Sequence, residues 1–241
     1  MTVFGFESQY IDVNGIETHY IEAGCGSEVL ILVHGGGAGA DGPSNYAHLM
    51  NRYGAHMRTI AVDMVGFGGS TMPSPDSFDY TQDARTDHLA GFIEAMGFNK
   101  VNLVGNSMGG TTTFGVALKR PDLVNKLVLM GAAINSSREI LAQRREHVAP
   151  VLAYDFTLEG MQRILDCLTY DYQPDDEYLQ YRYQATLNPR AQAAGKAIMK
   201  WVGENGLCYS DEQLASLIKL TERYCVVYQS LVNTPRLSVT Y

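Results

Sequence analysis

The stretch Val101-Asn102-Leu103-Val104-Gly105-Asn106-Ser107-Met108-Gly109-Gly110 decides the fold. An apolar run rich in β-branched residues leads into the pattern Gly105-x-Ser107-x-Gly109, and helical spacing follows it. This context predicts a nucleophile elbow, in which glycines allow a turn so tight that the serine hydroxyl stands clear of the sheet. Ser107 is therefore the predicted nucleophile, and the backbone N–H of Met108 is the first predicted oxyanion donor. An ordinary strand-to-helix turn is the alternative.

A second glycine motif lies upstream of the elbow. The apolar run Val29 to Val33 has the length of a buried strand, and His34-Gly35-Gly36-Gly37 follows it directly. Glycines at this place let a backbone N–H, of Gly35 or Gly36, face the same oxyanion as Met108. His34 is predicted to orient this loop rather than to act as a general base. A plain glycine loop is the alternative.

The chain has a recognisable order of elements. Strand and helix patterns alternate through residues 1–133, which predicts an α/β core with a mostly parallel sheet and right-handed crossovers. Residues 8–22 within this core are typical of a β-hairpin, with Asn14-Gly15 at its turn. From 134 to 205 only helical patterns remain, which predicts a helical cap inserted after the sixth strand. Residues 206–241 are the predicted remnant of the C-terminal part of the core.

Composition narrows the classes of protein. Eighteen basic and 26 acidic residues give a net charge of −8, which argues against nucleic acid or an anionic membrane as partner. No apolar run reaches the ~18 residues of a membrane span, and the N-terminus lacks the pattern of a signal peptide. The four cysteines are scattered without metal or redox spacing, so they are predicted to be reduced thiols in the cytoplasm.

These motifs resemble the α/β-hydrolase superfamily, and more narrowly the meta-cleavage product hydrolases, which split carbon–carbon bonds in ring-fission products of aromatic catabolism. The elbow 105–110 is similar to that of the family, including the less common asparagine before the serine. The loop 34–40, continuing to Ser44-Asn45, resembles the family's oxyanion loop, with departures at Ala38 and Pro43. Leu179-Gln180-Tyr181-Arg182 falls where the family's cap presents an arginine.

The resemblance implies a substrate and roles for site residues. The family substrate is a 2-hydroxy-6-oxo-dienoate, and Arg182 is expected to pair with its carboxylate. Asn106 is expected to hydrogen-bond the neighbouring hydroxy or oxo group, and Asn45 is a weaker candidate for the same polar pocket. A solvated cap arginine is the alternative for Arg182. Neither a metal nor a nucleotide cofactor is implied, the partner is a small molecule, and homo-oligomerisation is left open.

One part of the superfamily pattern is missing from the sequence. The superfamily order is serine, then aspartate or glutamate, then histidine. Residues 224–228 are the predicted seventh strand, yet no carboxylate follows Glu222 and no histidine follows His147. No triad acid or base is therefore assigned, and the core is expected to be C-terminally truncated, with an open apolar sheet edge that favours association between chains.

Three functional hypotheses follow. The first is a carbon–carbon bond hydrolase in a truncated or frame-shifted form, in which Ser107 lacks its base and turnover is in doubt. The second is a carboxylesterase or lactonase of the same fold. The third is a non-catalytic homologue that binds a small ligand in the capped pocket.

Overall fold

The computed structural model describes residues 1–137, 139, 149–169 and 173–216. The chain divides into two units, Met1–Cys208 and Tyr209–Tyr241. In the second unit, the N–H of Ser210 donates to Gln213 Oε1 at 2.8 Å and the N–H of Gln213 donates to Ser210 Oγ at 3.2 Å. These reciprocal bonds form a capping box, and it precedes helical residues 211–216. The strand predicted at 224–228 lies outside the described residues.

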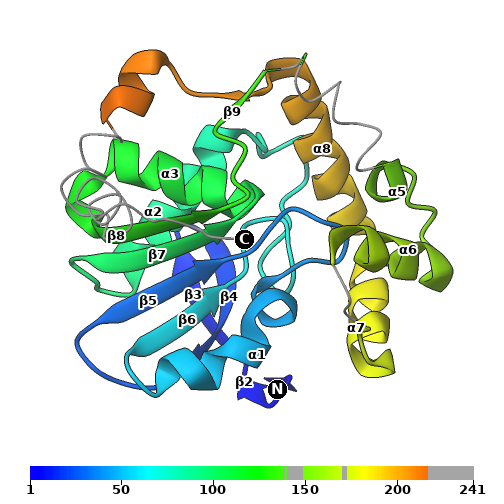
Figure 1. Cartoon of the computed structure of the whole chain (residues 1–241), viewed down its shortest axis with the longest axis horizontal. Helices are drawn as coiled ribbons and strands as arrows, with labels where there is room; N and C mark the ends of the chain where they lie inside the picture. The colour runs from blue at the N-terminus through cyan, green and yellow to red at the C-terminus, as the bar shows by residue number, and fades with distance from the viewer. Residues whose placement is uncertain (138, 140–148, 170–172, 217–241) are drawn as a thin grey trace, which may run out of the picture. The chain divides into compact units, whose positions relative to one another are not determined.

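The first unit is built on a six-stranded sheet of order β3-β4-β6-β5-β7-β8 (Figure 1). Strands β3 and β4 pair antiparallel, and β4 also pairs antiparallel with β6, whereas the pairs among β6, β5, β7 and β8 are parallel. The mostly parallel sheet predicted from the alternating pattern is confirmed. The strand bounds are β3 Gln9–Val13, β4 Ile16–Ala23, β5 Val29–Val33, β6 Arg58–Val62, β7 Val101–Asn106 and β8 Val124–Met130.

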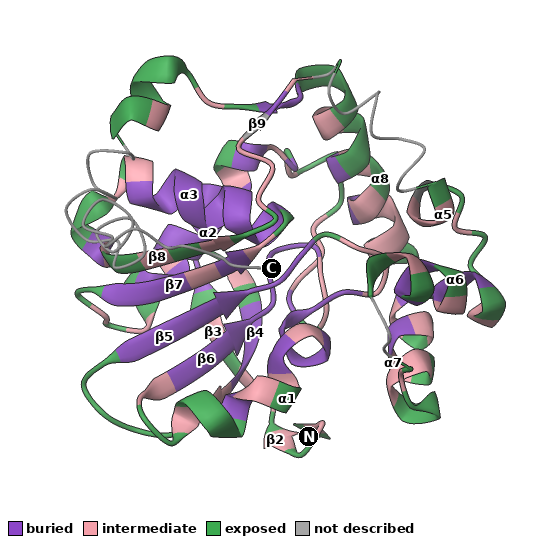
Figure 2. Ribbon diagram, in the orientation of Figure 1, coloured by how far each residue is buried: buried purple, intermediate pink, exposed green. Residues whose placement is uncertain are grey.

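Helices cover both faces of this sheet. Strand β5 is buried along its whole length (Figure 2), and its side chains alternate between two apolar clusters. Ile31 and Val33 pack with side chains of α2 and α3, whereas Leu30 and Leu32 pack with those of α1. A continuous apolar strand needs cover on both faces, which explains why the run 29–33 shows no alternation. The helix bounds are α1 Gly42–Gly54, α2 Gln82–Ala95 and α3 Met108–Lys119, and η1 Pro121–Leu123 follows α3.

Two hairpins begin the chain. Val13 pairs with Ile16 across Asn14 and Gly15, whose φ angles of 54° and 84° are those of a type I′ turn, so the predicted hairpin is confirmed. A shorter hairpin, β1 Thr2–Val3 and β2 Phe6–Glu7, was not predicted. Strands of two residues are too short to show an alternating pattern, so its only signal was the glycine turn.

The helices of the predicted cap lie together on one side of the sheet (Figure 1). A two-stranded sheet, β9 Asn135–Ser136 with β10 Leu207–Cys208, was missed, because the strand pattern was expected to vanish over 134–205. In that sheet Ser136 pairs with Leu207, so the two ends of the helical block meet. The helix bounds are α5 Ala149–Leu152, α6 Leu158–Leu168, α7 Asp176–Thr186 and α8 Pro189–Asn205.

Strand β8 lies at one end of the six-strand order, and β7 is its neighbour among the described residues. Val128 is 50% exposed and Met130 is 42% exposed, so apolar side chains reach the surface along this strand (Figure 2). Association of chains through this edge stays a prediction. Among the described residues, no helix has the length and apolar character needed to cross a membrane.

Candidate active site

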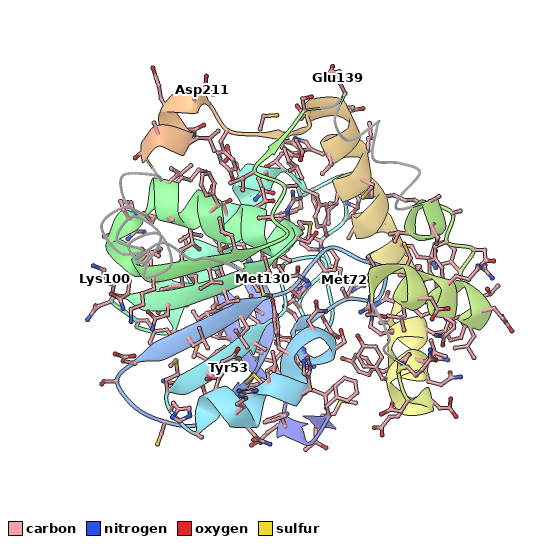
Figure 3. All side chains as sticks on the ribbon, viewed as in Figure 1. Tyr53, Met72, Lys100, Met130, Glu139 and Asp211 are labelled. Carbon is pink, nitrogen blue, oxygen red and sulfur yellow. The ribbon has the colours of Figure 1, made fainter. Side chains whose placement is uncertain are left out.

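Ser107 lies between the end of β7 and the start of α3, with backbone angles φ 52° and ψ −116°. A non-glycine residue rarely adopts a positive φ, so this turn is strained, as the elbow predicts. The side chain of Ser107 is exposed, and its backbone N–H donates to the carbonyl of Met130 at 2.8 Å. Figure 3 labels Met130 at the end of β8, beside the ends of β5 and β7. The turn is therefore tied to the neighbouring strand while its hydroxyl faces outward.

The elbow glycines are required by close backbone contacts. A Cβ on Gly109 would lie 2.3 Å from the carbonyl oxygen of Val33, and one on Gly105 would lie 2.5 Å from the carbonyl oxygen of Gly109. A Cβ on Gly110 would lie 2.6 Å from that of Ala132. Only glycine fits these positions without a shift of the backbone, which explains the spacing of the motif.

The loop of residues 34–41, here called the oxyanion loop, lies against the elbow. A Cβ on Gly35 would lie 3.4 Å from the Cβ of Ser107, and one on Gly36 would lie 2.9 Å from the sulfur of Met108. Met108 is the first residue of α3, so its N–H has no partner within the helix. The predicted donors therefore lie around the serine, with Gly35 beside Ser107 and Gly36 beside Met108.

His34 is buried beneath this loop with both ring nitrogens engaged. The N–H of Met64 donates to Nε2 at 3.0 Å, so the proton is on Nδ1, which donates to the carbonyl of Gly35 at 2.7 Å. Burial lowers the pKa of His34, which keeps the ring neutral. With no nitrogen left for the serine, His34 orients the loop, as predicted, and is not its general base.

Asp63 anchors the loop from behind. Its carboxylate accepts hydrogen bonds from the N–H of Gly42 at 2.7 Å and the N–H of Gly69 at 2.8 Å, and His19 Nδ1 lies 2.7 Å away. Asp63 is fully buried, and a buried carboxylate needs such partners. Gly42 follows the oxyanion loop directly, so these bonds hold the end of the loop to strand β6.

A cavity of about 740 Å³ brings together the three predicted substrate-binding side chains. Asn106 comes from the end of β7, Asn45 from the first turn of α1 and Arg182 from α7. This first cavity is also walled by Phe4 and Phe6 of the short N-terminal hairpin. Residues far apart in the sequence thus form one partly polar cavity beside the elbow.

Arg182 is buried rather than solvated, at 5% exposure. Its Nη2 and Nε donate to the carbonyl of Ala38 at 2.7 and 3.3 Å, and its Nη1 donates to the hydroxyl of Tyr178 at 3.2 Å. A guanidinium carries five N–H groups, so these three bonds leave two of them for a ligand in the first cavity. The solvated alternative for Arg182 does not fit this burial.

A second cavity of about 610 Å³ is lined in part by residues 36–40 of the oxyanion loop. It includes Gly36, Phe67, Tyr154 and Phe156, together with Met72, which is labelled in Figure 3. Most of its lining is apolar, which suits a hydrocarbon or aromatic group. The two cavities therefore differ in chemistry: the first holds Arg182, and the second is largely apolar.

The aromatic residues of the predicted cap do not all line a cavity. Tyr178 lines the first cavity, whereas Tyr181, Tyr183 and Trp201 line neither cavity. The ring of Trp201 lies 5.9 Å from the buried guanidinium of Arg85. Tyr170 and Tyr172 lie outside the described residues. The sequence shows that a helix carries several tyrosines, but helix rotation decides which rings reach a cavity.

The structure describes no base for Ser107. Within the part of the chain that it covers, the serine hydroxyl accepts or donates no hydrogen bond, and no cluster of histidine, cysteine and carboxylate side chains could hold a metal ion. His19 and His88 are buried against Asp63 and Thr18, and His48 and His56 are exposed. His147 lies outside the described residues. The triad partners of Ser107 thus stay unassigned.

Sequence reasoning missed Asp41, which is 1% exposed at the end of the oxyanion loop. Its Oδ1 accepts from the N–H of Ser44 at 2.7 Å and its Oδ2 accepts from the hydroxyl of Tyr181 at 2.5 Å. An aspartate two residues before a proline is a helix-start signal. Asp41 and Pro43 could therefore have predicted the hydrogen bond from the N–H of Ser44. No local pattern signals the second bond, since the two residues lie on different elements.

Comparison with known proteins agrees with this geometry. Residues 28–194 match the family described as alpha/beta hydrolase fold. The chain is 40% identical to a 2-hydroxy-6-oxo-6-(2'-aminophenyl)hexa-2,4-dienoic acid hydrolase of Metapseudomonas resinovorans, over 86% of this chain and 69% of that one. It is 34% identical to a 2-hydroxy-6-oxo-2,4-heptadienoate hydrolase of Pseudomonas putida, over 84% of this chain and 72% of the relative.

Solved structures give the same picture. A serine hydrolase involved in carbazole degradation, the CarC enzyme, matches with a TM-score of 0.75 at 40% identity, covering 86% of this chain and 74% of that one. The meta-cleavage product hydrolase CumD from Pseudomonas fluorescens matches with a TM-score of 0.74 at 30% identity, covering 87% and 75%. The chain belongs to the α/β-hydrolase family and, within it, to the meta-cleavage product hydrolases, as its motifs indicated.

Proposed function

We propose that this protein hydrolyses a carbon–carbon bond in a 2-hydroxy-6-oxo-dienoate, with Ser107 as nucleophile. The observation that carries the proposal is the first cavity, which joins Arg182, Asn45 and Asn106 beside the exposed serine. A carboxylate at one end of the substrate matches the guanidinium, and the polar amides match its hydroxy and oxo groups. The dienoate hydrolases among its relatives support the same substrate class.

Each side chain takes one role in this proposal. Arg182 binds the carboxylate with the two N–H groups that Ala38 and Tyr178 do not use. Asn106 and Asn45 hydrogen-bond the neighbouring oxygens. The N–H groups of Met108 and of Gly35 or Gly36 stabilise the oxyanion that forms when the carbonyl is attacked. Each such donor contributes about 2.7–4 kcal/mol to transition-state stabilisation.

The proposed reaction passes through an acyl-serine intermediate. The dienol first ketonises, which places a proton on carbon and prepares an electron sink. The oxygen of Ser107 then bonds to the remote carbonyl carbon and the hydroxyl proton passes to a base. The carbon–carbon bond breaks, the leaving carbon takes up a proton, and water hydrolyses the acyl-serine. No described residue supplies the base for the attack of Ser107. The roles proposed for this step are therefore those of the serine and the oxyanion donors.

The second cavity is proposed to hold the group beyond the cleaved ketone. Gly36 lines this cavity and lies against Met108, so the cavity begins beside the predicted oxyanion donors. Its apolar lining favours alkyl or aryl substituents over a second carboxylate. A substrate series with methyl, phenyl and carboxyethyl groups tests this choice, and preference for the carboxyethyl compound would contradict it.

The experiment for the function compares a dienoate with a simple aryl ester. Loss of the dienoate chromophore is expected in wild type and is expected to disappear in Ser107→Ala. Arg182→Ala is expected to raise KM for the dienoate by about ten- to a hundredfold, since a hydrogen bond to a charged group contributes about 1.5–3 kcal/mol. Esterase activity that is the same in wild type and in Arg182→Ala would favour the carboxylesterase or lactonase alternative.

Binding is measured separately from turnover. Titration calorimetry of Ser107→Ala with the dienoate is expected to show saturable binding that Arg182→Ala weakens. Binding without any Ser107-dependent turnover in wild type would support a ligand-binding homologue and overturn the hydrolase proposal. Absence of both binding and turnover would overturn the substrate class.

We also propose three parts for the chain: a core of residues 1–133, a cap of 134–205, and a C-terminal part of the core at 206–241. The pairing of Ser136 with Leu207 supports the cap as an insertion, since its two ends meet. Replacing residues 137–206 by a short glycine linker is expected to leave a folded core that no longer binds the dienoate. Loss of cooperative folding would contradict this division.

A cytoplasmic location is proposed as well. Cys25 and Cys208 are exposed cysteines outside any disulfide, which suits a reducing compartment. Fractionation of cells that produce the protein tests this, and recovery from a membrane or secreted fraction would contradict it.

A further inference from the structure

Helix α7 contacts the oxyanion loop (residues 34–41) at three places. The guanidinium of Arg182 donates to the carbonyl of Ala38 at 2.7 Å. Gly39, with φ 65°, lies against the backbone of Arg182 so closely that a Cβ there would be 2.1 Å from its carbonyl oxygen. The hydroxyl of Tyr181 donates to Asp41 Oδ2 at 2.5 Å. Two successive residues of one helix therefore contact three residues of the loop.

Tyr181 is separate from the proposed substrate site. It lines neither cavity, unlike Arg182 and Tyr178 on the same helix. Its ring lies 4.7 Å from the ring of Phe4 in the N-terminal hairpin, and this contact limits its rotation. The hydroxyl thus reaches the loop from a packed ring rather than from a freely rotating side chain.

Asp41 connects this contact to the first turn of α1, which directly follows the oxyanion loop. One carboxylate oxygen accepts from Tyr181, and the other accepts from the N–H of Ser44 as the N-cap of α1. Burial and the neighbouring charge of Asp63 raise the pKa of Asp41 to about 6. A buried carboxylate in this setting needs hydrogen-bond donors, and the tyrosine hydroxyl is one of them.

We propose that Tyr181 is a positioning residue, whose hydroxyl holds Asp41 and thereby keeps the N–H groups of Gly35 and Gly36 aligned with the elbow. The inference rests on the proposed function, because it assigns the oxyanion donors to this loop. It makes the cap a part of the oxyanion hole. Movement of α7 on substrate binding then shifts the donor N–H groups of the loop, although α7 contributes no oxyanion donor itself.

The test compares Tyr181→Phe with Tyr183→Phe, since Tyr183 lies on the same helix and lines neither cavity. Tyr181→Phe is expected to lower kcat for the dienoate by about ten- to a hundredfold, because small misplacement of catalytic groups has effects of this size. KM is expected to stay within about twofold, since Arg182 is kept. Tyr183→Phe is expected to change neither parameter.

A second readout requires no turnover. Hydrogen–deuterium exchange of the amides of residues 35–41 is expected to be faster in Tyr181→Phe and unchanged in Tyr183→Phe. In an Asp41→Asn background, Tyr181→Phe is expected to have a smaller effect on exchange and on kcat, because the two residues act through one bond. Thermal unfolding curves confirm that each variant is folded.

The outcomes separate the two proposals. Faster exchange in Tyr181→Phe with no dienoate turnover in wild type would refute the proposed function and leave the positioning role intact. Unchanged exchange in a folded Tyr181→Phe variant, or equal loss of kcat in both variants, would overturn the positioning role. An effect on KM alone would also overturn it, because it would place Tyr181 in substrate binding.

Discussion

Nδ1 of His19 lies 2.7 Å from Oδ2 of Asp63, and both side chains are buried where strands β4 and β6 meet the oxyanion loop. The same carboxylate accepts the backbone N–H groups of Gly42 and Gly69. Four segments of the chain thus meet at the carboxylate of Asp63. A substitution of Asp63 therefore tests how the oxyanion loop is supported.

Asp63→Asn is expected to destabilise the protein by about 3–5 kcal/mol, because it removes the charge that two backbone N–H donors and the buried ring of His19 surround. The free energy of unfolding in urea measures this. Asp76→Asn is the control, since Asp76 is exposed, and it is expected to stay within about 0.5 kcal/mol of wild type. Equal stability of the two variants would contradict the supporting role of Asp63.

Gly109→Ala is expected to abolish turnover and to destabilise the fold, because its Cβ would lie 2.3 Å from the carbonyl oxygen of Val33. Gly203→Ala on α8 is the matched control. A Cβ at Gly203 meets nothing within 4 Å, so alanine there is expected to stabilise the helix by about 0.5–1 kcal/mol. Thermal unfolding of both variants checks the pair, and a stable, active Gly109→Ala would contradict the elbow geometry.

The buried side chain of His88 is expected to make the free energy of unfolding depend on pH. Its Nε2 lies 2.8 Å from the hydroxyl of Thr18, and burial lowers its pKa from 6.5 to about 4. The folded state favours the neutral ring, whereas the unfolded state takes up a proton more readily. The contribution of His88 to the free energy of unfolding is therefore fully present above pH 6.5 and is lost as the pH falls towards 4. A shift of this size corresponds to roughly 3 kcal/mol.

His88→Gln removes this titration, so its unfolding free energy is expected to fall less than that of wild type between pH 6.5 and 4. His56→Gln is the control, because His56 is exposed, and it is expected to follow wild type. Urea titrations at several pH values measure both. Parallel curves for wild type and His88→Gln would show that His88 is not the group concerned.

Imidazole tests the missing base directly. In a polypeptide of these 241 residues, added neutral imidazole is expected to raise the rate of dienoate loss, because it can accept the proton of the Ser107 hydroxyl. Ser107→Ala is expected to show no such increase. A rate independent of imidazole would mean that a residue of the chain already serves as base, and His147→Ala would then be the next variant to measure.

Most of the core was predictable because its signals are local. The run Val29 to Val33 identified a buried strand, Asn14-Gly15 identified a hairpin turn, and the glycines around Ser107 identified the elbow. In each case the required backbone geometry restricts which residues fit, so a short pattern carries the information. The two-residue strands β9 and β10 were missed, because their pairing depends on where the helical block returns to the core.

The site was predictable only in part. The motif around Ser107 and the loop after Val33 identified the nucleophile and donors as candidates, and resemblance added Arg182. Neither source indicated that Arg182 binds the carbonyl of Ala38, or that Phe4 walls the first cavity. Such contacts join residues on separate elements, so they depend on how the helices of the cap are rotated against the core.

The sequence by itself determined the strand, the strained turn at Ser107 and the helix after it, because steric exclusion acts over a few neighbouring residues. Only the tertiary structure decided that Tyr181 meets Asp41, 140 residues away, and that Arg182 is buried beside the oxyanion loop. A hydrogen bond between distant residues exists only once packing has brought two surfaces together, and no local pattern records that event.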